Sequence, residues 1–124
     1  MDTCTFLWVA TDASRLSPAL RPVLEDSANE LLLSAASGWE ISIKHALGRL
    51  DLPEAPSLFM ARAIGVFQLA TLPIGFAHAV RGGELPLHHR DPFDRLLIAQ
   101  AEIEALPLAT PDPAFRPYAI EVMW

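Results

Sequence analysis

Four acidic residues lie at positions where carboxylates can do chemistry. Asp2 opens the polar stretch DTCT, Glu40 lies in SGWEIS, Asp94 lies in HHRDPFDRLL and Asp112 lies in ATPDPAF. Each lies where an expected strand ends or an expected helix begins. A cluster of three or four carboxylates selects Mg²⁺ or Mn²⁺ rather than zinc. Because such ions activate water and hold a phosphate during in-line displacement, convergence of these acids would indicate phosphodiester hydrolysis.

Each acid taken alone also has a structural explanation. Asp91, before a proline, is the expected helix cap, and it places Asp94 in the first turn, where the helix dipole favours an acid. Ser37 and Glu40 match the S-x-x-E capping box, and Asp112 lies in a proline-rich turn. A helix dipole contributes only about 0.3–1 kcal/mol. Convergence of four carboxylates costs more than that through repulsion, unless cations bind among them.

The elements that must position these acids are short and mixed. Apolar spacing and proline or glycine boundaries predict helices over 16–27, 37–50, 56–67, 75–85 and 91–105, and strands over 29–35, 68–74, 106–112 and 119–124. This order predicts a single α/β domain over residues 1–124, with a mainly parallel sheet and helices on both faces. In such sheets ligands bind beyond the carboxyl ends of the strands, which is where the four acids fall.

The composition sets limits on function. The 124 residues are 52% hydrophobic and carry a formal net charge of −6, which argues against a broad basic surface for nucleic acid. A metal-dependent nuclease is still compatible with this charge, because bound cations would neutralise part of it. No apolar run approaches the roughly 18 residues that cross a bilayer. With Cys4 as the single cysteine, no internal disulfide can form, and we expect a reducing cytoplasm.

Four stretches in order carry a family resemblance: DTCTFLW (2–8), SAASGWEISIKHALGRLDLP (34–53), HHRDPFDRLLIAQA (88–101) and PLATPDPAF (107–115). Together they resemble PIN-domain ribonucleases, in particular the VapC toxins of VapBC (type II) toxin–antitoxin pairs. The resemblance implies a three-layer α/β sandwich around a short, mainly parallel sheet. It also implies a metal-dependent endoribonuclease that cuts structured RNA, such as tRNA or ribosomal RNA loops, and is inhibited by a VapB-like antitoxin.

The resemblance also implies roles for individual residues. These are the catalytic acids Asp2, Glu40 and Asp94, the further Mg²⁺ or Mn²⁺ ligand Asp112, and the supporting hydroxyl groups of Thr3 and Thr110. One departure concerns the start of the fold, because only Met1 precedes Asp2 where family members carry a short apolar strand. We therefore expect this first strand to be missing or shortened, and Asp2 to be poorly held.

Residues next to the motifs offer contacts for RNA. Arg90 and Arg95 flank the expected helix cap and are candidates for binding RNA phosphates. The neighbouring His88 and His89 could suggest metal binding, but we expect both in a solvated loop, since the proposed ions prefer oxygen ligands.

A dense apolar stripe near the amino terminus offers contacts for proteins. Phe6, Leu7, Trp8 and Val9 are candidates for an antitoxin-binding groove or a homodimer contact. We expect Trp39 to lie in the core beside this stripe.

Two other classes of protein fit part of the pattern. A haloacid-dehalogenase-type phosphatase also places an aspartate after its first strand, but its chemistry needs D-x-D, and here Cys4 lies two residues beyond Asp2. A degenerate PIN domain that only binds protein is the other alternative, and it depends on Asp2 being poorly held.

Overall fold

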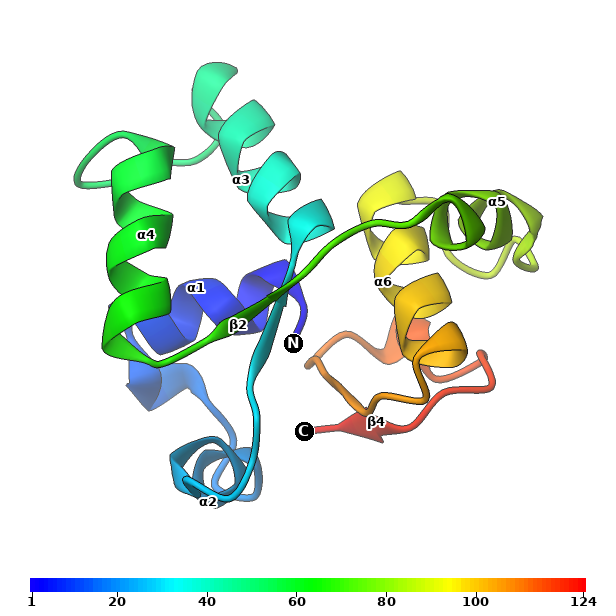
Figure 1. The fold of residues 1–124 in the computed structure, drawn as a ribbon, viewed down its shortest axis with the longest axis horizontal. Helices are drawn as coiled ribbons and strands as arrows, with labels where there is room; N and C mark the ends of the chain where they lie inside the picture. Colours follow the sequence, from blue (N-terminus) through cyan, green and yellow to red (C-terminus); the bar gives the residue numbers. More distant parts are fainter.

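The computed structural model describes residues 1–124 as alternating helices and short strands (Figure 1). The helices are α1 (Thr3–Thr11), α2 (Leu20–Glu25), α3 (Ala35–Ala46), α4 (Pro56–Val66), α5 (Phe76–Glu84) and α6 (Pro92–Ile103). The strands are β1 (Leu32–Ser34), β2 (Ala70–Leu72), β3 (Leu108–Ala109) and β4 (Val122–Met123), and 3-10 turns form at Ala13–Arg15 and Pro113–Phe115. Every strand and helix predicted from the sequence is present, with shorter bounds for most.

The strands form two parallel pairs rather than one sheet. β1 pairs with β2, and β3 pairs with β4. The first two residues lie between the pairs: the amino group of Met1 donates to the carbonyl of Leu32 (3.4 Å), and the N–H of Asp2 donates to the carbonyl of Ala109 (2.9 Å). The expected shortened first strand is thus a two-residue extended bridge between β1 and β3.

Helices cover both sides of the strands, as predicted. In Figure 1, α1, α3 and α4 lie on one side of β1 and β2, and α5 and α6 lie on the other. On the first side, Phe6, Ile41 and Phe59 pack around Leu33 of β1. On the second side, Ile98 belongs to a core cluster that also contains residues of β3 and the last turns of the chain. The α/β fold with parallel strands and flanking helices is therefore confirmed.

The first turn of α3 differs from the prediction. Ser34 caps the helix, because its Oγ accepts from the N–H of Ala36 (3.0 Å), and the helix begins at Ala35. The predicted capping box of Ser37 and Glu40 is therefore wrong, and Glu40 lies beyond the first turn. Capping does not explain an acid at this position.

Other helix ends follow local chemistry more closely. Gly48 follows the end of α3 and has a positive φ of 67°, which other residues rarely adopt. Gly82 and Gly83 do not stop α5, which continues to Glu84. The longest helices, α3 and α6, have 12 residues each, and none of the helices combines the length and the apolar character needed to cross a membrane.

Helix α6 is anchored by a buried polar residue that the sequence did not single out. The side chain of Gln100 accepts from the Ser34 hydroxyl (2.5 Å) and donates to the carbonyl of Pro73 (3.1 Å). These bonds connect α6 to the carboxyl ends of β1 and β2. Because the amide is buried and satisfied on both sides, it fixes the position of the helix that carries Asp94.

An apolar groove runs along β1 and β3. Its volume is about 390 Å³. Among its lining residues are Met1, Leu31, Leu32, Leu97, Leu106 and Leu108. It lies where the two strand pairs are joined only by the bridge at the start of the chain.

Candidate active site

Asp2 is buried and held by the backbone and by one hydroxyl group. Its Oδ1 accepts from the N–H of Thr5 (2.7 Å) and so caps α1, and its Oδ2 accepts from the hydroxyl of Thr110 (2.6 Å). The bond from its own N–H to Ala109 fixes the main chain. The expectation that Asp2 would be poorly held is therefore wrong, because α1 and β3 position it without a full strand before it.

Glu40 is buried beside Asp2 on α3. The hydroxyl of Thr3 donates to its Oε2 (2.5 Å) and lies 2.9 Å from the hydroxyl of Ser37. The ammonium of Lys44, one turn later, pairs with its Oε1, an i,i+4 spacing that favours such ion pairs on a helix. Partial burial lowers the pKa of Lys44, but the hydrogen bond and charge of Glu40, with other nearby carboxylates, raise it above its ordinary value.

Asp94 lies in the first turn of α6, behind the cap formed by Asp91, whose Oδ1 accepts from the N–H of Phe93 (2.8 Å). The pKa of Asp94 is raised from its ordinary value of 3.8 to about 7. Burial is the main cause, and the charges of the surrounding acids are the next. Those acids are Asp91, Glu40, Asp2 and Asp112. The residues that the motifs singled out therefore share one electrostatic environment.

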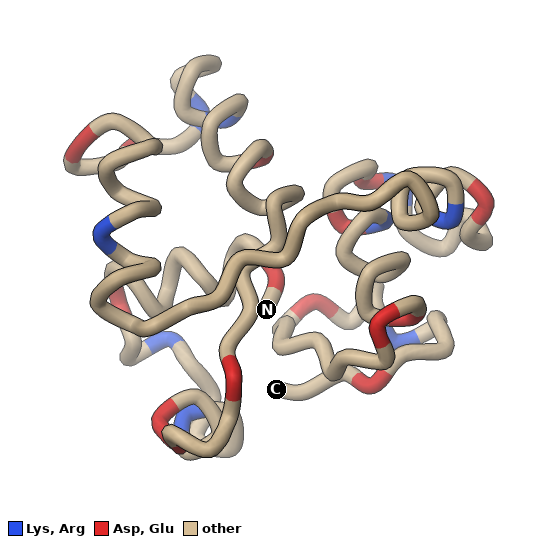
Figure 2. Tube along the Cα trace, viewed as in Figure 1, with Lys and Arg blue, Asp and Glu red and all other residues tan.

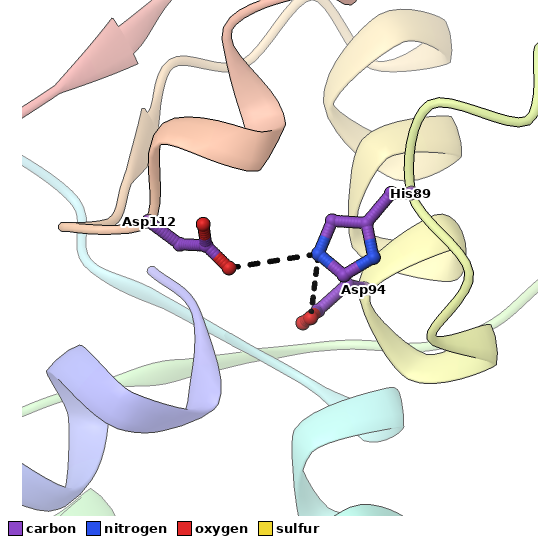
Figure 3. A group of neighbouring side chains, drawn as sticks. All are labelled: His89, Asp94 and Asp112. Atoms are coloured by element: carbon purple, nitrogen blue, oxygen red, sulfur yellow. Dashed lines mark ion pairs between the residues drawn. The ribbon is translucent and has the colours of Figure 1, made fainter.

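Asp112 enters the same site from the turn after β3. Its N–H donates to the hydroxyl of Thr110 (3.1 Å), and its Oδ1 accepts from the N–H of Ala114 (2.8 Å). Its Oδ2 lies 3.6 Å from Nε2 of His89, and that nitrogen lies 3.1 Å from Oδ2 of Asp94 (Figure 3). One imidazole ring therefore lies between the two carboxylates.

His89 was expected in a solvated loop, and this prediction is wrong. Its Nδ1 accepts from the N–H of Asp91 (3.2 Å), so the neutral ring carries its proton on Nε2, facing the acids. Nε2 is buried and has no partner of good hydrogen-bond geometry. The N–H of His89 donates to the hydroxyl of Tyr118 (2.6 Å), which fixes the loop. The clue in the sequence was its place in the same motif as Asp94; His88, by contrast, is exposed as expected.

Arg95 was a candidate for RNA binding, and the structure contradicts this role. Its guanidinium is buried and donates to the carbonyls of Gly82, Gly83, Leu85, Pro86 and His89. These five bonds use all five of its N–H donors. Arg95 therefore holds the loop that presents His89, and it has no donor left for a phosphate. Arg90, in the same loop, is exposed.

The apolar stripe is less open than expected. Phe6 is fully buried against Phe59, so its predicted contact with an antitoxin or a second copy is wrong. Leu7, Trp8 and Val9 are half-buried. Trp39 lies outside the core, with 56% of its surface exposed, which is also opposite to the prediction.

The residues of the site fit a divalent cation. Four carboxylates supply hard oxygen ligands, the type that Mg²⁺ and Mn²⁺ prefer. The raised pKa of Asp94 reflects burial and crowded negative charge, and a cation among the acids would relieve this repulsion. One carboxylate oxygen of Asp94 and one of Asp112 lie within 4.8 Å of each other and of a ring nitrogen of His89.

An α/β domain with an acid-lined site at the carboxyl ends of parallel strands is the class that this fold and site define. Within that class the chain belongs to the PIN domain family, which matches residues 1–121. It is also similar to Ribonuclease VapC16 of Mycobacterium tuberculosis (strain ATCC 25618 / H37Rv), with 37% identity over 59 residues. That segment covers 48% of this chain and 40% of the relative, so the match spans less than half of either protein. The predicted family is confirmed.

Proposed function

We propose that the chain is a divalent-metal-dependent endoribonuclease and acts as a VapC-type toxin. One observation carries the proposal: burial first, and then the charges of Asp91 and of the acids of the other three motifs, raise the pKa of Asp94 to about 7. The proposed catalytic acids are Asp2, Glu40 and Asp94, and Asp112 is the fourth proposed metal ligand. Mg²⁺ or Mn²⁺ bound there would supply an activated water and a clamp on the phosphate.

The hydroxyl groups of Thr3 and Thr110 orient the acids. Each donates one hydrogen bond to a carboxylate, on Glu40 and Asp2 respectively, and leaves other lone pairs of that carboxylate free for a cation. Such bonds set the direction of a metal ligand and strengthen it. His89 makes no such hydrogen bond, but its Nε2 lies 3.1 Å from Asp94 and 3.6 Å from Asp112, in a ring held by its own loop.

RNA is the proposed substrate because the curated relative is named a ribonuclease. We propose structured RNA with exposed loops, such as tRNA or ribosomal RNA. Arg90 is exposed and is the remaining arginine candidate for a phosphate contact. The similarity to a VapC protein is also the reason to propose a VapB-like antitoxin as partner. We further propose a cytoplasmic location. Leu7, Trp8 and Val9 are proposed to contact this antitoxin or a second copy of the chain in a homodimer.

The degenerate, protein-binding alternative loses its main support. It depended on a poorly held Asp2, and four hydrogen bonds hold this residue. The phosphatase alternative needs an acid two residues after Asp2, but Cys4 occupies that position and is exposed on α1.

The test compares two aspartates of one motif. Purified chain is incubated with a structured RNA and Mg²⁺, and cleavage rates are measured for Asp94→Asn and Asp91→Asn. A metal ion contributes several kcal/mol of transition-state stabilisation, so loss of its ligand should lower the rate roughly 10³-fold. Asp91→Asn should change the rate little, because asparagine caps a helix about as well as aspartate.

The same assay contains the outcome that would reject the proposal. Both variants should give the circular dichroism spectrum of the parent chain. If folded Asp94→Asn cleaves RNA at the parent rate, or if cleavage persists after a chelator removes divalent cations, the metal-dependent mechanism is wrong.

A further inference from the structure

Two aromatic residues directly precede two of the proposed catalytic acids. Trp39 precedes Glu40 on α3, and Phe93 precedes Asp94 on α6. Their rings contact each other across the two helices, with centroids 5.1 Å apart and planes at 79°. The aromatic pair therefore joins the same two helices as Glu40 and Asp94, one residue before each acid in the sequence.

Most of the indole remains open. Trp39 is 56% exposed, whereas Phe93 is half-buried. In an edge-to-face pair only one ring gives up a face to the other. Phe93 thus fixes the orientation of an indole whose remaining surface faces solvent. An exposed indole held in one orientation by a neighbouring ring offers a flat surface on which a planar group can stack.

We propose that Trp39, oriented by Phe93, stacks on an unpaired RNA base next to the phosphate that is cut. The inference rests on the proposed ribonuclease function and adds a base-binding position to it. The base is joined through its sugar to a phosphate, so stacking at Trp39 brings that phosphate toward the acids of the same two helices. Stacking accepts any base, because every base has a π-face.

The charges of the chain favour a base over further phosphate contacts. Of the nine Lys and Arg side chains, Lys44, Arg62 and Arg81 are paired with acids, and Arg95 is buried. Figure 2 shows the basic positions scattered over separate elements. With a net charge of −6, the chain has few free cations to bind a polyanion. Stacking contributes affinity that does not require them.

The experiment pairs a protein change with a substrate change. RNA hairpins that the parent chain cuts are made with a single abasic position at each site of the loop in turn. Their affinity is measured by fluorescence anisotropy in the Asp94→Asn background, which prevents cutting, and their cleavage is measured in the active chain. The variants are Trp39→Ala and Trp39→Phe, with Phe76→Ala as control, because Phe76 is 88% exposed on a different helix, α5.

Trp39→Ala should weaken binding of the intact hairpin by roughly tenfold or more, as loss of base–aromatic stacking does. Trp39→Phe should retain part of the affinity, and Phe76→Ala should retain all of it. At one loop position, removal of the base should weaken binding to the parent by a similar factor and should remove the effect of Trp39→Ala. That single position should neighbour the cut site.

Two results would overturn the inference. One is equal affinity of Trp39→Ala and the parent for every hairpin. The other is a Trp39→Ala defect that persists with every abasic substrate, which would indicate a structural role or a protein contact, and light scattering would then reveal a changed oligomeric state.

If the parent cuts no RNA but binds hairpins made from tRNA loops in a Trp39-dependent way, the nuclease proposal fails and the stacking inference stands. If cutting is normal in Trp39→Ala, only the stacking inference fails.

Discussion

The acid site and the apolar groove differ in how they treat polar groups. In the acid site, Asp2, Glu40 and Asp112 each accept at least one hydrogen bond, so buried or half-buried charge is held by donors. The groove along β1 and β3 has a volume of about 390 Å³ and a mostly apolar lining. Met1 and Asp2 are adjacent, yet Met1 lines the groove and Asp2 belongs to the acid site. The change from one environment to the other occurs within one peptide unit.

From this difference we expect the acid site to determine activity and the groove to affect stability. The acid site concentrates repulsion that a cation would relieve, and its geometry depends on caps and hydroxyl groups. The groove costs stability because packing is incomplete where β1 and β3 are not paired with each other. The buried amino group of Met1 adds a second cost. Loss of solvent disfavours its charged form and so lowers its pKa. Changes in the acid site should therefore affect activity and the pH dependence of stability, and changes in the groove should affect the free energy of unfolding.

The largest expected effect concerns the acid site and is a change in the pH dependence of stability. Because the folded protein raises the pKa of Asp94 from 3.8 to about 7, it binds a proton that the unfolded chain releases above about pH 4. The contribution of this group to stability is therefore complete below pH 4 and falls as pH rises to about 7, by on the order of 4 kcal/mol. Asp94→Asn should abolish this fall.

The measurement is urea unfolding of metal-free protein at pH 5 and pH 8. Asp51→Asn, at an exposed position outside the site, is the control and should keep the pH dependence of the parent. Addition of Mg²⁺ at pH 8 should stabilise the parent more than Asp94→Asn. An identical pH dependence for the parent and Asp94→Asn would show that Asp94 is not crowded by its neighbours.

An intermediate effect is expected at the groove. Leu97 is 3% exposed on α6, lines the groove, and lies one turn after Asp94. Leu97→Ala should lower the free energy of unfolding by about 2–3 kcal/mol, the lower part of the range for a buried leucine, because the site already borders a void. RNA cleavage per folded molecule should not change.

The control for this variant is Ile103→Ala, near the end of the same helix and 44% exposed. It should alter stability by no more than about 0.5 kcal/mol. A loss of cleavage in fully folded Leu97→Ala would contradict the expectation that the groove affects only stability, because it would couple the groove to the acid site.

The smallest of these effects is expected at the hydroxyl that links two acids. The Thr110 hydroxyl donates to Asp2 and accepts from the N–H of Asp112. Thr110→Val keeps the shape and removes both bonds, so apparent Mg²⁺ affinity or cleavage should fall roughly 10–100-fold. Thr110→Ser keeps the hydroxyl and should stay near the parent. Cleavage measured over a range of Mg²⁺ concentrations distinguishes them, and equal behaviour of the two variants would rule out the orienting role.

The sequence predicted well where local rules decide. Asp91 followed by proline set the start of α6, Gly48 set the end of α3, and the spacing of Glu40 and Lys44 gave their pair. Caps, positive φ angles and i,i+4 pairs depend on neighbours within one turn of helix, so residue types are enough. The order of strands and helices likewise gave the α/β class and the parallel pairing.

Residues whose partners are distant in the sequence could not be assigned in this way. From the sequence alone, Arg95 is predicted to be a solvent-exposed cation. In the structure, carbonyl groups of the preceding segment surround its guanidinium. From the sequence alone, His89 is predicted to lie in a solvated loop. In the structure, Asp112 lies next to it, from the turn after β3. Trp39 is predicted to lie in the core because its helix is apolar. In the structure its ring contacts Phe93 of α6 and is largely exposed.

The sequence by itself therefore determined the class of fold, the helix caps and the four acids worth examining. Only the tertiary structure decided that Met1 and Asp2 bridge two separate strand pairs and that the acids lie close enough to perturb the pKa of Asp94. The physical reason is that caps and periodicity are short-range, whereas burial, desolvation and repulsion between charges depend on which distant segments the core brings together.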